Sequence, residues 1–130
     1  MQQLSALDAL FLHLETPATP MHVGSCILFT PPAKHRGSFY PKIRDHIAAR
    51  MHLAPLFSRR LAFMPFAVAT PMWTTAEKVD LAHHIQTVKL PKPGSTAQCE
   101  AMIAKLHEGL LDRDRPLWQL RLLKAWLRGS

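Results

Sequence analysis

Apolar residues recur every three or four positions in several stretches of the chain, and this spacing predicts amphipathic helices. The first helix begins at Ser5, which forms a capping-box-like start with Asp8, and it ends near Glu15. The second helix follows Ser38 and must end before Pro55. The apolar faces of these two helices consist of Leu4, Leu7, Leu10, Phe11 and Leu14 in the first and of Phe39, Ile43, Ile47 and Met51 in the second.

A third helix is predicted to open at Ser95, which has Gln98 three residues later and so forms a second capping-box pattern. We expect this helix to end within the charged cluster at residues 112–115, because Pro116 disfavours helical geometry at the residue before it. Its inward face is predicted to contain Cys99, Met102, Ile103, Leu106 and Leu110.

Strands are predicted where short apolar runs lie between prolines. Residues 21–29 form such a run, too short for a buried helix, and we expect a buried strand there. Gly24 within it indicates a close approach by another backbone or side chain, or a bulge. Residues 59–66 are predicted to form a second strand, residues 71–73 a loop or strand start, and residues 80–90 a weaker strand.

A last strand is predicted from Trp118 onward, because apolar residues alternate through Leu120, Leu122 and Trp126 while the other face is also partly apolar. Such two-sided strands are typical of layered α/β structures. Residues 129–130, Gly-Ser, indicate a turn, so we expect a hairpin whose return strand is missing. The order helix, strand, helix, strand, strand, helix, strand predicts one α/β domain with parallel and antiparallel strand pairs and no linker or repeat.

Composition narrows the class of protein. The chain has 130 residues, is 48% hydrophobic and carries 16 lysines and arginines against 9 aspartates and glutamates, a formal net charge of +7. This charge admits phosphates, anionic lipid or nucleic acid. However, the basic residues are scattered singly or in pairs, so we expect no nucleic-acid binding. No run approaches the roughly 20 apolar residues of a membrane helix. Two lone cysteines, Cys26 and Cys99, and no secretory signal indicate a reducing cytoplasmic location, with peripheral membrane contact admissible.

The eight histidines raise the question of catalysis or metal binding. His83 and His84 would point to opposite faces of the predicted strand, and Asp80 is the one carboxylate near them, so we expect no metal site. His22 is better explained as a hydrogen-bonded core histidine than as a catalytic one. The others on predicted helices, His46, His52 and His107, have no partner one turn away and are expected at the surface or its boundary.

Two further groups have a structural and a functional interpretation. The charged cluster at residues 112–115 is more often a solvated helix end than a site. Trp118 and Trp126 are more often core residues than ligand platforms. There is no nucleophile elbow, no glycine-rich phosphate loop and no carboxylate pair for glycoside chemistry. Motifs read from the residues alone therefore name no enzyme class.

The order and spacing of several short motifs do resemble one family, the bacterial wax ester synthase/acyl-CoA:diacylglycerol acyltransferases, over nearly the whole chain. The first motif is Ser5-x-x-Asp8-x-x-Phe11-Leu12-x-x-Glu15 followed by Pro20-Met21-His22-Val23-Gly24. The others are Pro55-x-Phe57 before Arg60-Leu61, Trp73 ahead of Asp80-Leu81-x-x-His84, Leu90-Pro91-x-Pro93-Gly94, and Leu111-Asp112-Arg113-x-Arg115-Pro116-Leu117-Trp118.

The resemblance implies a partial chloramphenicol-acetyltransferase-like (CoA-dependent acyltransferase) domain, a mixed sheet with flanking helices. In this family two related domains enclose a tunnel, so residues 1–130 would be an incomplete N-terminal acyltransferase domain without its second domain. The family's catalytic motif, His-His-x-x-x-Asp-Gly, is not in the sequence, and His83-His84 does not replace it because Val88-Lys89 stands where Asp-Gly is required. The motif's second histidine serves as the base that removes the alcohol proton in the family.

The resemblance leads to two functional hypotheses. The first is the N-terminal part of an O-acyltransferase that uses acyl-CoA as co-substrate and diacylglycerol or a long-chain alcohol as acceptor, makes triacylglycerol or wax ester, needs no other cofactor and is inactive alone. Pro116, Leu117 and Trp118 would then belong to an acyl-CoA channel or serve an interdomain role. The second is a non-catalytic module that docks on lipid inclusions or pairs with another acyltransferase chain, with an open sheet edge that favours self-association. A condensation domain of peptide synthesis fits the Met-His-Val-Gly and Pro-Leu-Trp motifs less well.

Overall fold

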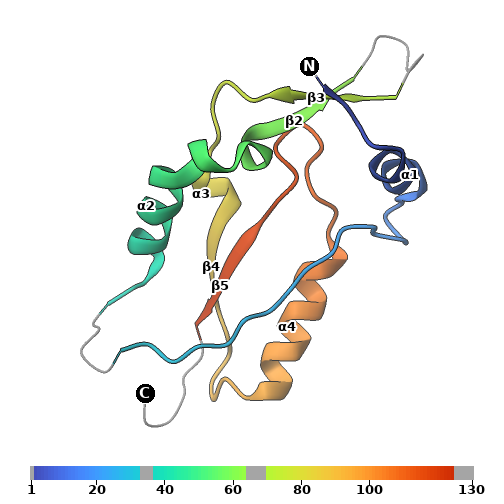
Figure 1. Ribbon diagram of the computed structural model, residues 1–130. Coiled ribbons are helices and arrows are strands. Elements are labelled where there is room, and N and C mark those ends of the chain that lie inside the picture. Colours follow the sequence, from blue (N-terminus) through green and yellow to red (C-terminus); the bar gives the residue numbers. More distant parts are fainter. Residues whose placement is uncertain (1, 33–36, 64–69, 125–130) are drawn as a thin grey trace.

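The computed structural model describes residues 2–32, 37–63 and 70–124 (Figure 1). In chain order its elements are β1 (Gln2–Gln3), α1 (Ala6–Leu14), α2 (Tyr40–Arg50), the 3-10 turns η1 (Met51–Leu53) and η2 (Pro55–Ser58), β2 (Arg59–Ala62), β3 (Met72–Thr75), α3 (Leu81–His84), β4 (Ile85–Lys89), α4 (Thr96–Glu108) and β5 (Leu120–Lys124). Some predictions lie outside the described residues. They concern residues 64–66, the end of the strand predicted at 59–66, as well as Trp126 and the turn at 129–130.

The strands form two small sheets. In the antiparallel sheet the order is β1-β3-β2, and Leu61 lies opposite Trp73. In the second sheet β4 and β5 pair in parallel, with Ile85 opposite Leu120, and α4 makes the crossover between them. Figure 1 shows α2 and α4 on opposite sides of the β4–β5 pair. The predicted α/β layering with both kinds of strand pair is confirmed.

Two of the predicted helix starts are confirmed by their caps. The Ser5 hydroxyl accepts a hydrogen bond from the Asp8 backbone N–H at 3.1 Å. Ser95 and Gln98 form a reciprocal capping box, in which each side chain accepts from the other residue's backbone N–H. The predicted cap of the second helix is wrong: the cap position of α2 is Phe39, which makes no side-chain cap bond, and the Ser38 hydroxyl one residue before it accepts from the N–H of Tyr40. Local side-chain chemistry therefore sets where α1 and α4 begin.

Two predicted boundaries are wrong. The Asp80 carboxylate accepts from the N–H of Ala82, so residues 81–84 form a helical turn and the strand begins only at Ile85. The helix α4 ends at Glu108, before Gly109, rather than in the charged cluster. There the Asp112 carboxylate accepts from the N–H of Asp114, which favours a turn over a helix.

The buried strand predicted at residues 21–29 is also wrong. The segment is extended in outline, but it has no ladder of hydrogen bonds to a strand in the described part of the chain. Its large apolar side chains face solvent, with Val23 94%, Ile27 80% and Leu28 84% exposed. Cys26, expected to be a buried thiol, is exposed, whereas Cys99 is half-buried. A strand-like pattern without a neighbouring strand gives an exposed extended segment.

The described core is small. Its large buried apolar side chains are Leu61 of β2, Ile85 of β4 and Leu90 just after β4. The predicted apolar face of α1 contributes none, because no residue of this helix is buried. The two sheets and the crossover helix thus hold their shape around few fully covered residues, and much apolar surface remains open to solvent.

Candidate functional site

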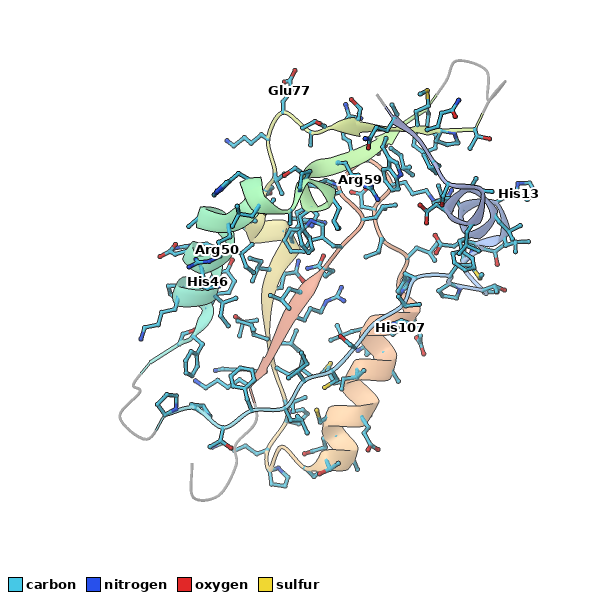
Figure 2. The ribbon with its side chains drawn as sticks, in the orientation of Figure 1. His13, His46, Arg50, Arg59, Glu77 and His107 are labelled. Atoms are coloured by element: carbon cyan, nitrogen blue, oxygen red, sulfur yellow. The ribbon has the colours of Figure 1, made fainter. Side chains whose placement is uncertain are left out.

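A cavity of about 870 Å³ lies where the loop after β3, the helix α3 and the turn before β5 meet. Figure 2 shows the Glu77 side chain on its rim pointing away from the molecule. The lining is strongly charged and contains one buried histidine. Its members are Arg60, Ala76, Glu77, Lys78, Asp80, His84, Asp112, Asp114, Arg115 and Pro116.

The charged cluster at residues 112–115 forms one wall of this cavity through ion pairs that the sequence did not reveal. Arg115 lies 3.3 Å from the Asp112 carboxylate and 3.7 Å from that of Asp80. One guanidinium therefore contacts two carboxylates and offsets the charge of one. Arg60 and Lys78 line the same cavity. The cluster is a solvent-exposed turn between α4 and β5, rather than a helix end, and the Arg115–Asp80 pair connects it to the start of α3.

His84 is the buried polar residue of the cavity wall, with 1% of its surface exposed. Its Nδ1 lies 2.8 Å from the backbone carbonyl of Trp118. Since a carbonyl only accepts, Nδ1 carries the ring proton and donates it, which leaves Nε2 as a bare acceptor. Within the described residues Nε2 has no hydrogen-bond partner. His83 contributes its backbone instead, since its carbonyl accepts from the Gln119 side chain at 2.7 Å.

The environment of His84 keeps its imidazole neutral. Burial away from water lowers its pKa, and the positive charges of His83 and Arg115 lower it further, although the Trp118 carbonyl and Asp80 act in the opposite direction. The predicted placement of His83 and His84 on a strand was wrong.

This pKa shift predicts a pH dependence of stability. The folded pKa of His84 lies below about 6.5, the value of the unfolded chain, so between the two the unfolded state binds more protons. The contribution of His84 to the unfolding free energy should therefore be constant above pH 6.5 and fall as the pH drops from there through the folded pKa. In urea unfolding at pH 7.5 and 5.5, His84→Gln should lose less stability on acidification than the wild type. His46→Gln, at an exposed position, is the control and should follow the wild type.

The Pro-Leu-Trp motif lies beside this histidine. Pro116 is buried in the cavity wall, and Leu117 is half-buried. The Trp118 indole stacks on His84 with ring centroids 4.5 Å apart, meets Phe57 edge-on at 5.3 Å, and donates from Nε1 to the Phe57 carbonyl at 2.9 Å. Trp118 thus joins η2, α3 and β5 within the fold, although it is half-buried rather than fully in the core as expected.

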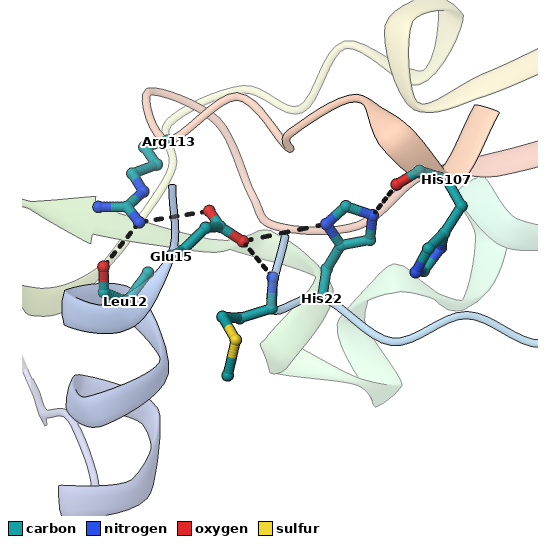
Figure 3. Close-up of polar contacts among 6 residues, drawn as sticks. Leu12, Glu15, His22, His107 and Arg113 are labelled. Carbon is teal, nitrogen blue, oxygen red and sulfur yellow. Dashed lines mark hydrogen bonds and ion pairs between the residues drawn. The ribbon is translucent and has the colours of Figure 1, made fainter. Parts of the chain in front are cut away.

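A second polar cluster ties the end of α1 to the same turn (Figure 3). The Glu15 carboxylate, 10% exposed, accepts from the N–H of Met21 at 3.0 Å and lies 3.3 Å from the Arg113 guanidinium. Arg113 also donates to the Leu12 carbonyl at 2.8 Å, which closes the last turn of α1. His22 lies 4.0 Å from Glu15 and donates from Nε2 to the His107 carbonyl at 2.9 Å.

This cluster confirms one sequence prediction and adds residues that the sequence analysis missed. His22 is hydrogen-bonded and mostly buried, as expected. The close approach expected at Gly24 is not required, because a Cβ there would lie 3.4 Å from the His107 ring, an ordinary van der Waals contact. The roles of Glu15 and Arg113 were missed. Both residues lie in the family-like motifs, which could have marked them as important. However, motif spacing does not show that two residues 98 positions apart form an ion pair.

Other kinds of site find no support in the part of the chain that the structure covers. No group of three or more histidines, cysteines or carboxylates in residues 2–32, 37–63 and 70–124 is arranged to hold a metal ion. In the same residues no helix is long and apolar enough to cross a bilayer.

Comparison with known proteins identifies the family. The model of the wax ester synthase/diacylglycerol acyltransferase catalytic domain matches residues 4–127. A "Putative diacyglycerol O-acyltransferase" of Mycobacterium tuberculosis strain H37Rv is 37% identical over 122 residues, which are 94% of this chain and 24% of that protein. A "Probable diacyglycerol O-acyltransferase" of the same strain is 32% identical over 118 residues, 91% of this chain and 26% of its own length.

A solved structure shows the same fold. The wax ester synthase/diacylglycerol acyltransferase of Marinobacter aquaeolei VT8 superposes with a TM-score of 0.82 at 31% identity, over 98% of this chain and 30% of that one. The predicted CoA-dependent acyltransferase-like fold is therefore confirmed. The chain spans about a quarter of the length of the curated relatives described above. It belongs to the wax ester synthase/diacylglycerol acyltransferase family.

Proposed function

We propose that this chain is part of an O-acyltransferase that moves an acyl group from acyl-CoA to diacylglycerol or a long-chain alcohol. The observation that carries the proposal is the match of residues 4–127 to the family's catalytic-domain model. The relatives named as diacylglycerol O-acyltransferases support it. No cofactor besides the acyl-CoA co-substrate is required, because the thioester carbonyl carbon is already an electrophile, the acceptor alcohol supplies the attacking oxygen, a base removes its proton and CoA leaves as the thiolate.

The base is expected outside this chain. Its sequence contains no His-His-x-x-x-Asp-Gly motif, and His84 at the cavity is followed by Val88-Lys89 instead. We therefore propose that residues 1–130 act as an incomplete N-terminal acyltransferase domain, inactive alone and cytoplasmic or peripheral at a membrane or lipid inclusion. Its contribution would be binding and positioning rather than proton transfer.

The proposed contribution centres on the Pro-Leu-Trp motif. Pro116 lines the 870 Å³ cavity, and Leu117 and Trp118 follow directly. The cations of Arg60, Lys78 and Arg115 on this lining are outnumbered by the carboxylates of Glu77, Asp80, Asp112 and Asp114, so we do not propose the cavity itself as a phosphate site. The motif would instead line an acyl-CoA channel, with Trp118 fixing the turn that presents Pro116 and Leu117.

A chimera tests this function. This chain replaces the aligned segment of the Marinobacter enzyme, and ester formation from palmitoyl-CoA with hexadecanol or dioleoylglycerol is measured by thin-layer chromatography. We expect the chimera to make ester and the 130-residue chain alone to make none. In the chimera, Leu117→Asp should raise KM for palmitoyl-CoA at least tenfold, whereas Leu53→Asp, at a position 70% exposed on η1, should not. A folded chimera without activity, or ester synthesis by the chain alone, would contradict the proposal.

A second candidate is a non-catalytic module that contacts lipid or self-associates through an open sheet edge. One observation favours it, namely that α1 exposes Leu7, Leu10, Phe11 and Leu14 to between 39% and 58%. Such an apolar helix face can lie on a lipid surface. The chimera separates the two candidates, because a module without an acyltransferase role would leave it folded and inactive.

A further inference from the structure

His84 is held so that neither of its ring nitrogens is open to a substrate. Nδ1 donates to the Trp118 carbonyl at 2.8 Å, and Nε2 is buried, without a partner in the described residues. A general base needs a nitrogen within hydrogen-bond reach of the proton that it removes. The contacts of His84 are therefore with the protein itself, and the residue that they hold is Trp118.

Two different parts of Trp118 contact His84. The backbone carbonyl accepts the Nδ1 proton, and the indole lies on the imidazole with ring centroids 4.5 Å apart and planes at 17° to each other. The hydrogen bond sets the direction of the peptide carbonyl, and the stack sets the direction of the side chain. A third contact follows at the next residue, since the Gln119 side chain donates to the His83 carbonyl at 2.7 Å. The last two residues of α3 thus hold the chain at the start of β5.

The backbone of Trp118 also belongs to a tight turn that contains Leu117. The Trp118 N–H donates to the Pro116 carbonyl at 3.0 Å, which closes a three-residue turn with Leu117 at its centre. On the other side of Trp118 the chain enters the parallel sheet, where Leu120 lies opposite Ile85. The direction in which the Leu117 side chain leaves the turn therefore depends on the peptide groups of Trp118, and His84 binds one of them.

We propose that His84 is a positioning residue for acyl-CoA binding, because it fixes the Trp118 peptide and through it the side chain of Leu117. The inference rests on the proposed function, in which Leu117 lines the acyl-CoA channel. In this role His84 touches no reacting atom. The apparent affinity for a ligand falls with the fraction of molecules that hold the binding conformation. A loosened turn should therefore weaken acyl-CoA binding and leave kcat unchanged, since the base is expected outside this chain.

Two amide substitutions at His84 test the position of the donor. The amide nitrogen of asparagine is bonded as Nδ1 is in histidine, whereas that of glutamine lies one bond farther out, where Nε2 was. In the chimera with the Marinobacter enzyme, His84→Asn should keep the Kd for palmitoyl-CoA within about threefold, and His84→Gln should raise it about tenfold. Both variants lose the stack on the indole, so the difference between them measures the hydrogen bond.

Calorimetric titration measures Kd, ester formation at saturating palmitoyl-CoA measures kcat, and urea unfolding measures stability. We expect kcat to be the same in both variants. His46→Gln, at an exposed position of α2, is the control and should leave Kd unchanged. In the 130-residue chain, hydrogen exchange of the Trp118 amide should be faster with His84→Gln than with His84→Asn, because this amide closes the turn at Leu117. If His84→Gln does not fold, His84→Leu, which also lacks a donor, takes its place.

Several outcomes would overturn the positioning role. Equal Kd values for the asparagine and glutamine variants would show that the donor does not matter. A loss of kcat in both variants with Kd unchanged would make His84 a group of the reaction itself. A folded chimera that binds palmitoyl-CoA but makes no ester would count against the proposed function alone, because the Kd values of the variants can still be compared. A folded chimera that binds no palmitoyl-CoA would overturn both.

Discussion

Replacing Trp118 by alanine is expected to lower the free energy of unfolding by about 4 kcal/mol, because large aromatic side chains removed from a packed site cost this much. Three contacts are lost at once: the stack on His84, the edge contact with Phe57 and the hydrogen bond from Nε1 to the Phe57 carbonyl. Few large side chains are buried in the described residues, so the remaining core contacts cannot make up for the lost stability. Urea unfolding followed by circular dichroism measures the change.

Trp118→Phe is the matched variant. A phenyl ring keeps both ring contacts and loses only the Nε1 donor, so about 1 kcal/mol should be lost. If Trp118→Ala and Trp118→Phe each lower the free energy of unfolding by less than about 1 kcal/mol, Trp118 does not hold η2, α3 and β5 together. The pair also separates structure from substrate binding at the Pro-Leu-Trp motif. In the chimera, a loss of activity in Trp118→Phe without a loss of stability would indicate direct contact of the indole with acyl-CoA.

The elements predicted correctly from sequence are those fixed by short-range chemistry. Ser5 and Ser95 mark where their helices begin, because each serine hydroxyl and the backbone amide that it caps are three residues apart in the sequence. The parallel pair β4–β5 follows from a crossover helix of ordinary length between two strand-like runs. In each case the pattern and the structure depend on the same local residues.

The predictions that failed concern features that depend on residues distant in the sequence. Residues 21–29 have the composition of a buried strand, but burial requires a neighbouring strand, which a local pattern cannot supply. The cavity likewise depends on pairs distant in sequence, such as Arg115 with Asp80 and His84 with Trp118. Motif order recovered the family, whereas only the structure showed that Arg113 belongs to the Glu15 cluster and Arg115 to the cavity wall.

Glu15→Ala is expected to be the second most damaging change, at about 3 kcal/mol of unfolding free energy, the usual cost of removing one partner from a buried charge pair. The carboxylate is 10% exposed and serves Arg113 and the Met21 amide together, and alanine leaves both without it. Asp45→Ala removes an ion pair with Arg44 that is largely exposed, so it should cost about 0.5 kcal/mol or less and serves as the control.

Glu15→Gln distinguishes charge from hydrogen bonding in this cluster. Glutamine keeps one oxygen that can accept from either Arg113 or the Met21 amide, but it carries no charge, so an intermediate loss of about 1.5 kcal/mol is expected. Hydrogen exchange of the Met21 amide gives a local measurement, since its protection depends on Glu15. If that protection survives in Glu15→Ala, the segment that follows is not fixed by this carboxylate. The start of this segment would then be held by the hydrogen bond from His22 to the His107 carbonyl of α4.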